Sequence, residues 1–234
     1  MKLSTIEVAF MAVFAALQAV LSLIPLSFTI GVSGEITLGV VGGALIGILL
    51  GPLIGGLAVL IGSFIGVMLN PAGAIFGIFS VLPPFFGAIG SGCIKIKKGY
   101  IAGAIVLVSL LVFYAHPFGR GALFYPLLHI IAMIIAFSPL AYMAGKTFDS
   151  PQLAKPILGI IVASFVGVLT DHITGSAIGI WYYPFLTPDK WYAIAFVYPV
   201  ERLVALTLST IIAVPLYSSL KKAKLLDLNR KDST

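Results

Sequence analysis

ITLGVVGGALIGILLGPLIGGLAVLIGSFIGVML, residues Ile36–Leu69, contains no charged side chain, and its glycines recur every four residues. Residues four apart lie on the same side of a helix, so this spacing predicts a stripe without side chains. In lipid, helices associate through such stripes, because small residues let two backbones approach closely. We therefore expect a packing centre built from Gly39, Gly43, Gly47, Gly51 and Gly55, followed by Ala58, Gly62 and Gly66.

The same stretch is too long to form a single membrane helix. A continuous helix would be about 50 Å long at ~1.5 Å per residue, against a hydrocarbon core of ~30 Å. The expected break is at Gly51-Pro52, because proline cannot donate a hydrogen bond inside a helix. The stretch therefore predicts two short helices joined by a tight turn.

The composition places the whole chain in a membrane. Of its 234 residues, 60% are hydrophobic and 9% are charged, which is too few charges to cover the surface of a soluble protein. The net charge of +6 comes from basic residues beside apolar segments, so it indicates membrane topology and not nucleic-acid binding. The single cysteine, Cys93, excludes an intrachain disulfide. The first apolar run lacks the cleavage pattern of a signal peptide.

Hydropathy divides the chain into eight predicted spans. They cover residues 4–25, 36–50, 53–69, 74–92, 100–115, 122–145, 157–180 and 191–218. Spans 36–50 and 100–115 are short, so the sequence does not decide whether they cross the membrane fully. This division puts Arg120 and Lys190 on the outer side, and it gathers on the inner side Lys2, Lys95, Lys97, Lys98, Lys146, Lys155, Lys221, Lys222, Lys224, Arg230 and Lys231.

This positive-inside bias predicts that both termini lie in the cytoplasm. The expected fold is an all-α integral membrane protein, a compact bundle of about eight transmembrane helices. Residues 1–220 form one transmembrane domain in this interpretation, and residues 221–234 form a basic cytoplasmic tail.

Four ionisable residues lie inside the last two predicted spans, as the dipeptides Asp171-His172 and Glu201-Arg202. Counted from the outer loop between the spans, Asp171 and Arg202 are each about ten residues, or ~15 Å, deep. Buried charges in lipid pair with one another or face a water-filled cavity. We expect Asp171 and Arg202 to face each other, either as a structural ion pair or as part of a solute site in which Arg202 indicates an acidic solute.

Aromatic residues gather in the loop between these spans, IWYYPFLTPDKWY. Such rings favour the headgroup depth of a membrane, and they also form platforms for planar heteroaromatic ligands. The first predicted outer loop, residues 26–35, is either a connector or a lid. His129, below the outer surface in the sixth predicted span, is either a packing residue or a ligand. The predicted solute-binding residues are Glu35, His129, Asp171, His172, Trp181, Tyr182, Glu201 and Arg202.

The first span carries a face of small residues, Ala9, Ala12, Ala16 and Ala19. Their spacing of three and four residues places them on one side of a helix. Such a face packs either against another span of the same chain or against a separate membrane subunit.

This alanine face, the turn GALIGILLGPLIGGL at 43–57 and the ending PVERLVALTLSTIIAVPLY at 199–217 together resemble the substrate-binding S components of energy-coupling-factor (ECF) importers. The stretch TDHITGSAIG at 170–179 is similar to the penultimate helix of archaeal-type members. The family usually has six spans, so the fifth and sixth spans predicted here look like an extra helix pair.

The resemblance implies a function and a set of partners. The alanine face would dock on a transmembrane coupling subunit, with Ala12-Ala16 and Ala15-Ala19 matching the family's AxxxA pattern. A vitamin or similar micronutrient would bind from outside, at positions corresponding to Gly31–Glu35, Trp181–Tyr183 and the level of Asp171 and Arg202. The metal-coordinating N-terminal histidine of the cobalt and nickel members is absent from MKLST, which argues against a metal site.

The sequence contains no HExxH, GxSxG or P-loop motif, so we expect no enzyme activity and no cofactor. The predicted function is a solute-binding subunit of an ECF importer in the cell membrane. Its expected partners are a small-molecule substrate, a coupling subunit, an ATPase pair and membrane lipid, but no nucleic acid. The alternatives are a proton-coupled transporter that uses Asp171 or Glu201 and, less favoured, a lipid-modifying enzyme that uses Asp171 and His172.

Overall fold

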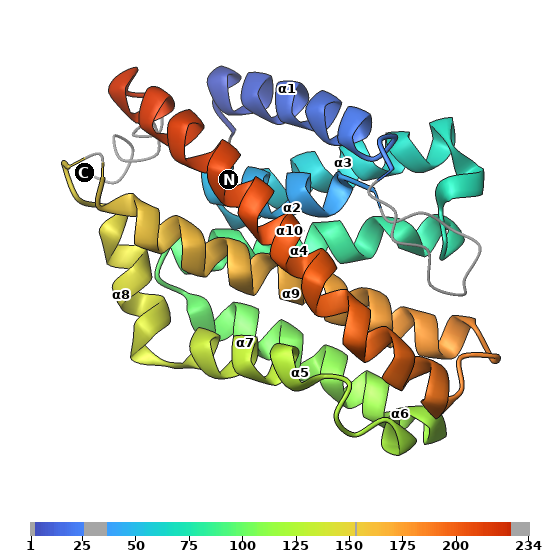
Figure 1. The fold of residues 1–234 in the computed structure, drawn as a ribbon. Helices are drawn as coiled ribbons and strands as arrows, with labels where there is room; N and C mark the ends of the chain where they lie inside the picture. The colour runs from blue at the N-terminus through green and yellow to red at the C-terminus, as the bar shows by residue number, and fades with distance from the viewer. Residues whose placement is uncertain (1–2, 26–36, 153, 226–234) are drawn as a thin grey trace.

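The computed structural model describes residues 3–25, 37–152 and 154–225, which form an all-helical bundle (Figure 1). Within these ranges an isolated bridge between Pro25 and Thr37 is present, but no β-strand. The helices in chain order are α1 (Thr5–Leu21), α2 (Gly39–Leu50), α3 (Pro52–Leu69), η1 (Pro71–Gly73), η2 (Gly77–Val81), α4 (Leu82–Lys95), α5 (Gly99–Ala115), α6 (Pro117–Gly121), α7 (Leu127–Phe137), α8 (Pro139–Thr147), α9 (Pro156–Tyr182) and α10 (Pro188–Lys222).

Four helical segments of the described chain are long and apolar enough to cross a membrane: α3, η2 with α4, α9 and α10. Helices α7 and α8 add a fifth if they form one broken span, bent by 69° where Pro139 begins α8. Helices α1, α2 and α5 are apolar but shorter. The predicted all-α membrane class is confirmed, whereas the number of spans and their orientation stay predictions.

The predicted break between α2 and α3 is confirmed. Helix α2 ends at Leu50, and α3 begins at Pro52, where the missing N–H of proline costs no helical hydrogen bond. Gly51 joins the two helices with a φ of 81°, a conformation that glycine adopts without the steric penalty of a side chain.

The glycine stripes bring helices into backbone contact. A Cβ added to Gly47 would overlap the carbonyl oxygen of Ala88 in α4, and one added to Gly62 would overlap that of Ala15 in α1. Helix α2 therefore packs on α4, and α3 packs on α1, at distances that only small residues allow. The prediction that this stretch is a packing centre is confirmed, except that a Cβ added to Gly51, at the turn, would meet no described atom within 4 Å.

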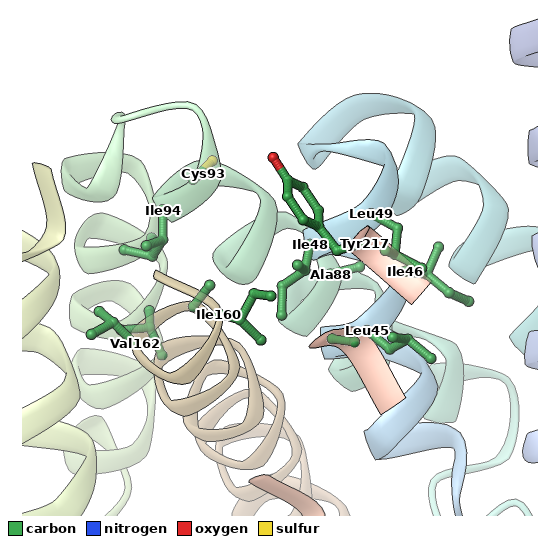
Figure 2. Close-up of a cluster of buried hydrophobic side chains, with 14 of the residues drawn as sticks. Leu45, Ile46, Ile48, Leu49, Ala88, Cys93, Ile94, Ile160, Val162 and Tyr217 are labelled. Atoms are coloured by element: carbon green, nitrogen blue, oxygen red, sulfur yellow. The ribbon is translucent and has the colours of Figure 1, made fainter. Parts of the chain in front are cut away.

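The main apolar core lies where α2, α4, α9 and α10 meet. Figure 2 shows Leu45 and Ile48 of α2 near Ala88 of α4, Ile160 of α9 and Tyr217 of α10. Most of α9 is buried, since it packs against α2, α4, α5, α7, α8 and α10. Helix α10 lies across the outside of the bundle, and most of its residues are exposed or partly exposed (Figure 1).

Basic residues gather at the end of the bundle where α2 stops and α10 ends. Lys95 donates to the carbonyl oxygen of Leu49 at 2.6 Å, and Lys97 pairs with Asp149 at 2.6 Å. Lys221 reaches the carbonyl oxygen of Phe148 at 3.2 Å. Lys95, Lys97 and Lys221, which the sequence assigned to the inner side of the membrane, thus lie at one end of the described bundle.

We expect this lysine end to face the cytoplasm. In a background in which Cys93 is replaced by serine, a cysteine at Thr187 should react with a membrane-impermeant thiol reagent added outside intact cells. Cysteines at Lys98 and Lys222 should react only after permeabilisation, and all three positions have described, exposed side chains. Labelling of Lys98→Cys from outside, with Thr187→Cys protected, would reverse the orientation.

Candidate functional site

A pocket of about 260 Å³ lies between α2, α3, α9 and α10, at the end of the bundle opposite the lysines. The start of α4 contributes Pro83 and Pro84, and the segment before η2 contributes residues 73–76. Ser22 and Thr37, which lie on either side of the first predicted outer loop, also line the pocket.

The α9 wall is built from the stretch TDHITGSAIG. Asp171, Gly175 and Gly179 lie four residues apart, so they share one face of the helix, and all three line the pocket. A Cβ on Gly179 would lie 3.2 Å from the ring of Phe76. The two glycines therefore leave a flat wall against which this ring stands.

The α10 wall carries Trp191 at one end and Arg202 at the other. Eleven residues separate them, so they are about 16 Å apart along the helix axis. Trp191 lies close to Gly179, whereas Arg202 lies close to Asp171. The pocket is consequently elongated along α9 and α10, with an aromatic end and a charged end.

Three charged side chains meet at the charged end. Arg202 Nη1 lies 3.8 Å from Asp171 Oδ1, and Arg202 Nη2 lies 3.7 Å from Glu201 Oε2. The prediction that Asp171 and Arg202 face each other is confirmed. Both distances exceed those of good hydrogen bonds, although the Arg202 side chain is only 6% exposed. Arg202 attracts both carboxyl groups, but the contacts do not satisfy the hydrogen bonds of the three side chains.

Three pocket-lining groups keep polar atoms unpartnered. Trp191 Nε1, Glu201 Oε1 and Arg202 Nε are buried and have no hydrogen-bond partner among the described residues. These residues are 3%, 4% and 5% exposed. Buried polar atoms in folded proteins are nearly always paired with protein, water or ligand. Residues of the pocket lining thus keep two donors and one acceptor without a partner in the described chain.

The aromatic end is formed by Phe76, Tyr183 and Trp191. The Tyr183 hydroxyl donates to the carbonyl oxygen of Ile75, which ties the end of α9 to the segment before η2. The rings of Phe76 and Tyr183 are 6.1 Å apart. Trp191 packs edge-on against Tyr125 at 4.8 Å, so its ring is held in place from behind.

His129 lies behind the pocket and contacts it through His172. His129 Nε2 shares a hydrogen bond of 2.9 Å with His172 Nδ1, and both rings stack on Tyr198. This bond orients the ring of His172, which lines the pocket. Of the predicted solute-binding residues, Asp171, His172, Glu201 and Arg202 therefore lie together at the pocket, with His129 one contact away.

The other predicted aromatic residues lie outside the pocket lining. Trp181 is 58% exposed and donates from Nε1 to the carbonyl oxygen of Val112 at 3.1 Å. Tyr182 is 47% exposed and approaches the edge of Phe76. Their exposure fits the interfacial aromatic belt. Glu35 lies outside the described residues, and a role for each of these three in solute binding stays a prediction.

The sequence analysis missed several lining residues, among them Ser63, Asn70, Phe76 and Ser176. A signal existed for Asn70, which is the first amide after a long uncharged stretch. Ser63 also had one, because it follows Gly62 in a helix that otherwise lacks polar side chains. Phe76 had none, since sixteen phenylalanines are spread along the chain.

Helix α1 presents the alanine face in two parts. Ala9, Ala12 and Ala16 are exposed, whereas Ala19 is buried at the side of α1 that packs on α3. The side of α1 that packs on α3 also carries Gln18, which is fully buried.

Gln18 connects α1 to the pocket wall. Its Nε2 donates to Ser63 Oγ at 3.0 Å and to the Gly39 carbonyl oxygen at 3.2 Å. Both Gly39 and Ser63 line the pocket. Within the described residues, no group of three or more histidine, cysteine or acidic side chains is placed to hold a metal ion.

Comparison with known proteins identifies the family. Residues 2–150 match the family described as ECF-type riboflavin transporter, S component. An uncharacterized protein of Methanocaldococcus jannaschii is 35% identical over 128 residues, which cover 55% of this chain and 43% of that relative. The match thus spans less than half the length of the relative. No solved structure matches the chain. The family match covers most of the chain, and the chain therefore belongs to the ECF-type riboflavin transporter S components, which are substrate-binding membrane subunits of transporters and not enzymes.

Proposed function

We propose that this chain captures a vitamin or similar planar heteroaromatic micronutrient from outside the cell and passes it inward with an ATP-driven coupling module. The observation that carries the proposal is the elongated pocket with three unpartnered buried polar atoms, on Trp191, Glu201 and Arg202. Ligand sites combine apolar walls with a few convergent polar groups in this way.

The pocket and the family point to the same kind of solute. Flat apolar surfaces at Phe76, Gly175 and Gly179 suit a planar ring, and the charged end supplies hydrogen bonds that would fix its orientation. Riboflavin, which the family's name mentions, is the first solute to test. The chain contains no P-loop motif, so in this proposal ATP hydrolysis belongs to partner subunits.

We expect the purified protein to retain or bind such a solute at one molecule per chain. Native mass spectrometry would detect a retained solute directly. In a Trp181→Phe variant, Trp191 is the remaining tryptophan, so a stacked ligand should quench its fluorescence. A Trp191→Phe variant should lose this signal. Absence of both a retained mass and quenching by riboflavin or other vitamins would contradict the proposed function.

The ion pair between Asp171 and Arg202 should contribute to stability whether it is a structural pair or part of the solute site. Removing one partner of a buried pair strands the other charge and costs about 3–5 kcal/mol. Arg202→Ala and Asp171→Ala should each lower the free energy of unfolding, and the double variant should recover part of the loss. Additive losses would show that the two side chains do not interact in the folded protein.

The same double-mutant cycle, measured with and without solute, separates the two roles. Coupling that stays constant when solute binds indicates a structural lock. Coupling that changes when solute binds places the pair in the solute site, because the solute then competes for or reinforces the same charges.

The exposed alanine face should be needed for assembly but not for solute binding. Ala12→Leu and Ala16→Leu should abolish uptake or co-purification with the coupling module, because overpacking a tight interface costs about 1–3 kcal/mol. Solute affinity of the isolated protein should be unchanged. The matched control is Ala104→Leu, at an exposed position of α5. Loss of folding in Ala16→Leu alone would instead assign the face to internal packing.

A further inference from the structure

We infer that the solute carries a positively charged or protonated nitrogen, which binds beside Glu201 at the charged end of the pocket. This inference rests on the proposed function and names the chemical class of its solute. It departs from the acidic solute that Arg202 indicates when the sequence is considered alone.

The first step is the charge of the pocket lining. Among its described residues, the acidic and basic groups are Asp171, Glu201 and Arg202, with histidine counted as neutral. The lining therefore holds two acidic groups against one basic group. An anionic group placed next to Arg202 would also lie next to both carboxylates, and its repulsion from them would offset the attraction.

The second step is the state of Glu201. The residue is 4% exposed, and its Oε1 has no hydrogen-bond partner among the described residues. Its Oε2 lies 3.7 Å from Arg202, which is shared with Asp171. A buried carboxylate with one oxygen unpaired is costly unless a donor reaches it. A cationic N–H group supplies both the missing hydrogen bond and the missing charge.

The third step is the rest of the pocket. The walls that lead to Glu201 carry Phe76, Tyr183 and Trp191. Aromatic faces attract cations as well as planar rings, because the ring quadrupole is negative above its plane. A cationic heteroaromatic ring is therefore accommodated along the whole pocket, whereas an anionic ring is favoured only at Arg202.

Charge-matched probes test this inference. Nicotinate, nicotinamide and 3-(aminomethyl)pyridine share one pyridine ring and are anionic, neutral and, through a protonated primary amine, cationic at neutral pH, respectively. Their binding can be measured by isothermal titration calorimetry, which needs no contact with Trp191, or by displacement of a retained solute. We expect 3-(aminomethyl)pyridine to bind about 10- to 100-fold more tightly than nicotinate, as for one charge-assisted hydrogen bond.

The matched variants are Glu201→Gln and Asp189→Asn. Both remove one carboxylate charge from α10, but Asp189 is exposed in the first turn and lies outside the pocket lining. The preference for the cationic probe should collapse in Glu201→Gln and persist in Asp189→Asn. If Glu201→Gln fails to fold, the ranking of the three probes by their affinity for the native chain still tests whether the solute is cationic.

The opposite results overturn the inference. Tighter binding of nicotinate, equal binding of all three probes, or a retained solute without a basic nitrogen would each refute a cationic solute while leaving the proposed function intact. A protein that retains no solute and binds none of the probes or vitamins would refute the proposed function, and this inference with it.

Discussion

The close approach of backbones at the glycine stripes is the constraint on which the rest of the structure depends. Gly47 lets α2 lie on the carbonyl groups of α4, and Gly62 does the same for α3 on α1. Without a hydrophobic driving force between helices in lipid, contacts of this kind hold the bundle together. These contacts also determine where the pocket lies. Helices α2 and α3, joined at Gly51, contribute Gly39 and Ser63 to the same pocket that α9 and α10 line.

The pocket concentrates polar groups that a membrane interior otherwise excludes. Charges in a bilayer are costly, so they are retained where they pair or perform a function. Asp171 and Arg202 pair, but the geometry leaves Glu201 Oε1 and Arg202 Nε unpartnered within the described chain. A purely structural lock would be expected to satisfy its own hydrogen bonds. The incomplete pairing is therefore better explained by a site whose hydrogen bonds are completed by a solute.

The sequence predicted the parts of the fold that depend on local chemistry. Gly51-Pro52 predicted the break in the hairpin because the constraint lies in two adjacent residues. Matching depths predicted that Asp171 and Arg202 meet, since rise per residue is fixed in a helix. The sequence could not predict the positions of Phe76 and Gln18, because their roles arise from contacts between distant segments. Trp181 and Trp191 show the same limit: both belong to one aromatic loop sequence, but helix direction buries only the second.

Helix α1 joins the pocket to the alanine face that we propose as the docking surface for a coupling subunit. One side of it exposes Ala9, Ala12 and Ala16, and another side directs Gln18 to Gly39 and Ser63 in the pocket wall. A helix shifts as a rigid element, so a movement of α1 would break these two hydrogen bonds and leave the fully buried Gln18 amide unsatisfied. Binding free energies at linked sites are reciprocal. Any coupling that Gln18 carries would therefore act in both directions, with solute in the pocket restraining α1 as much as a partner on α1 restrains the pocket.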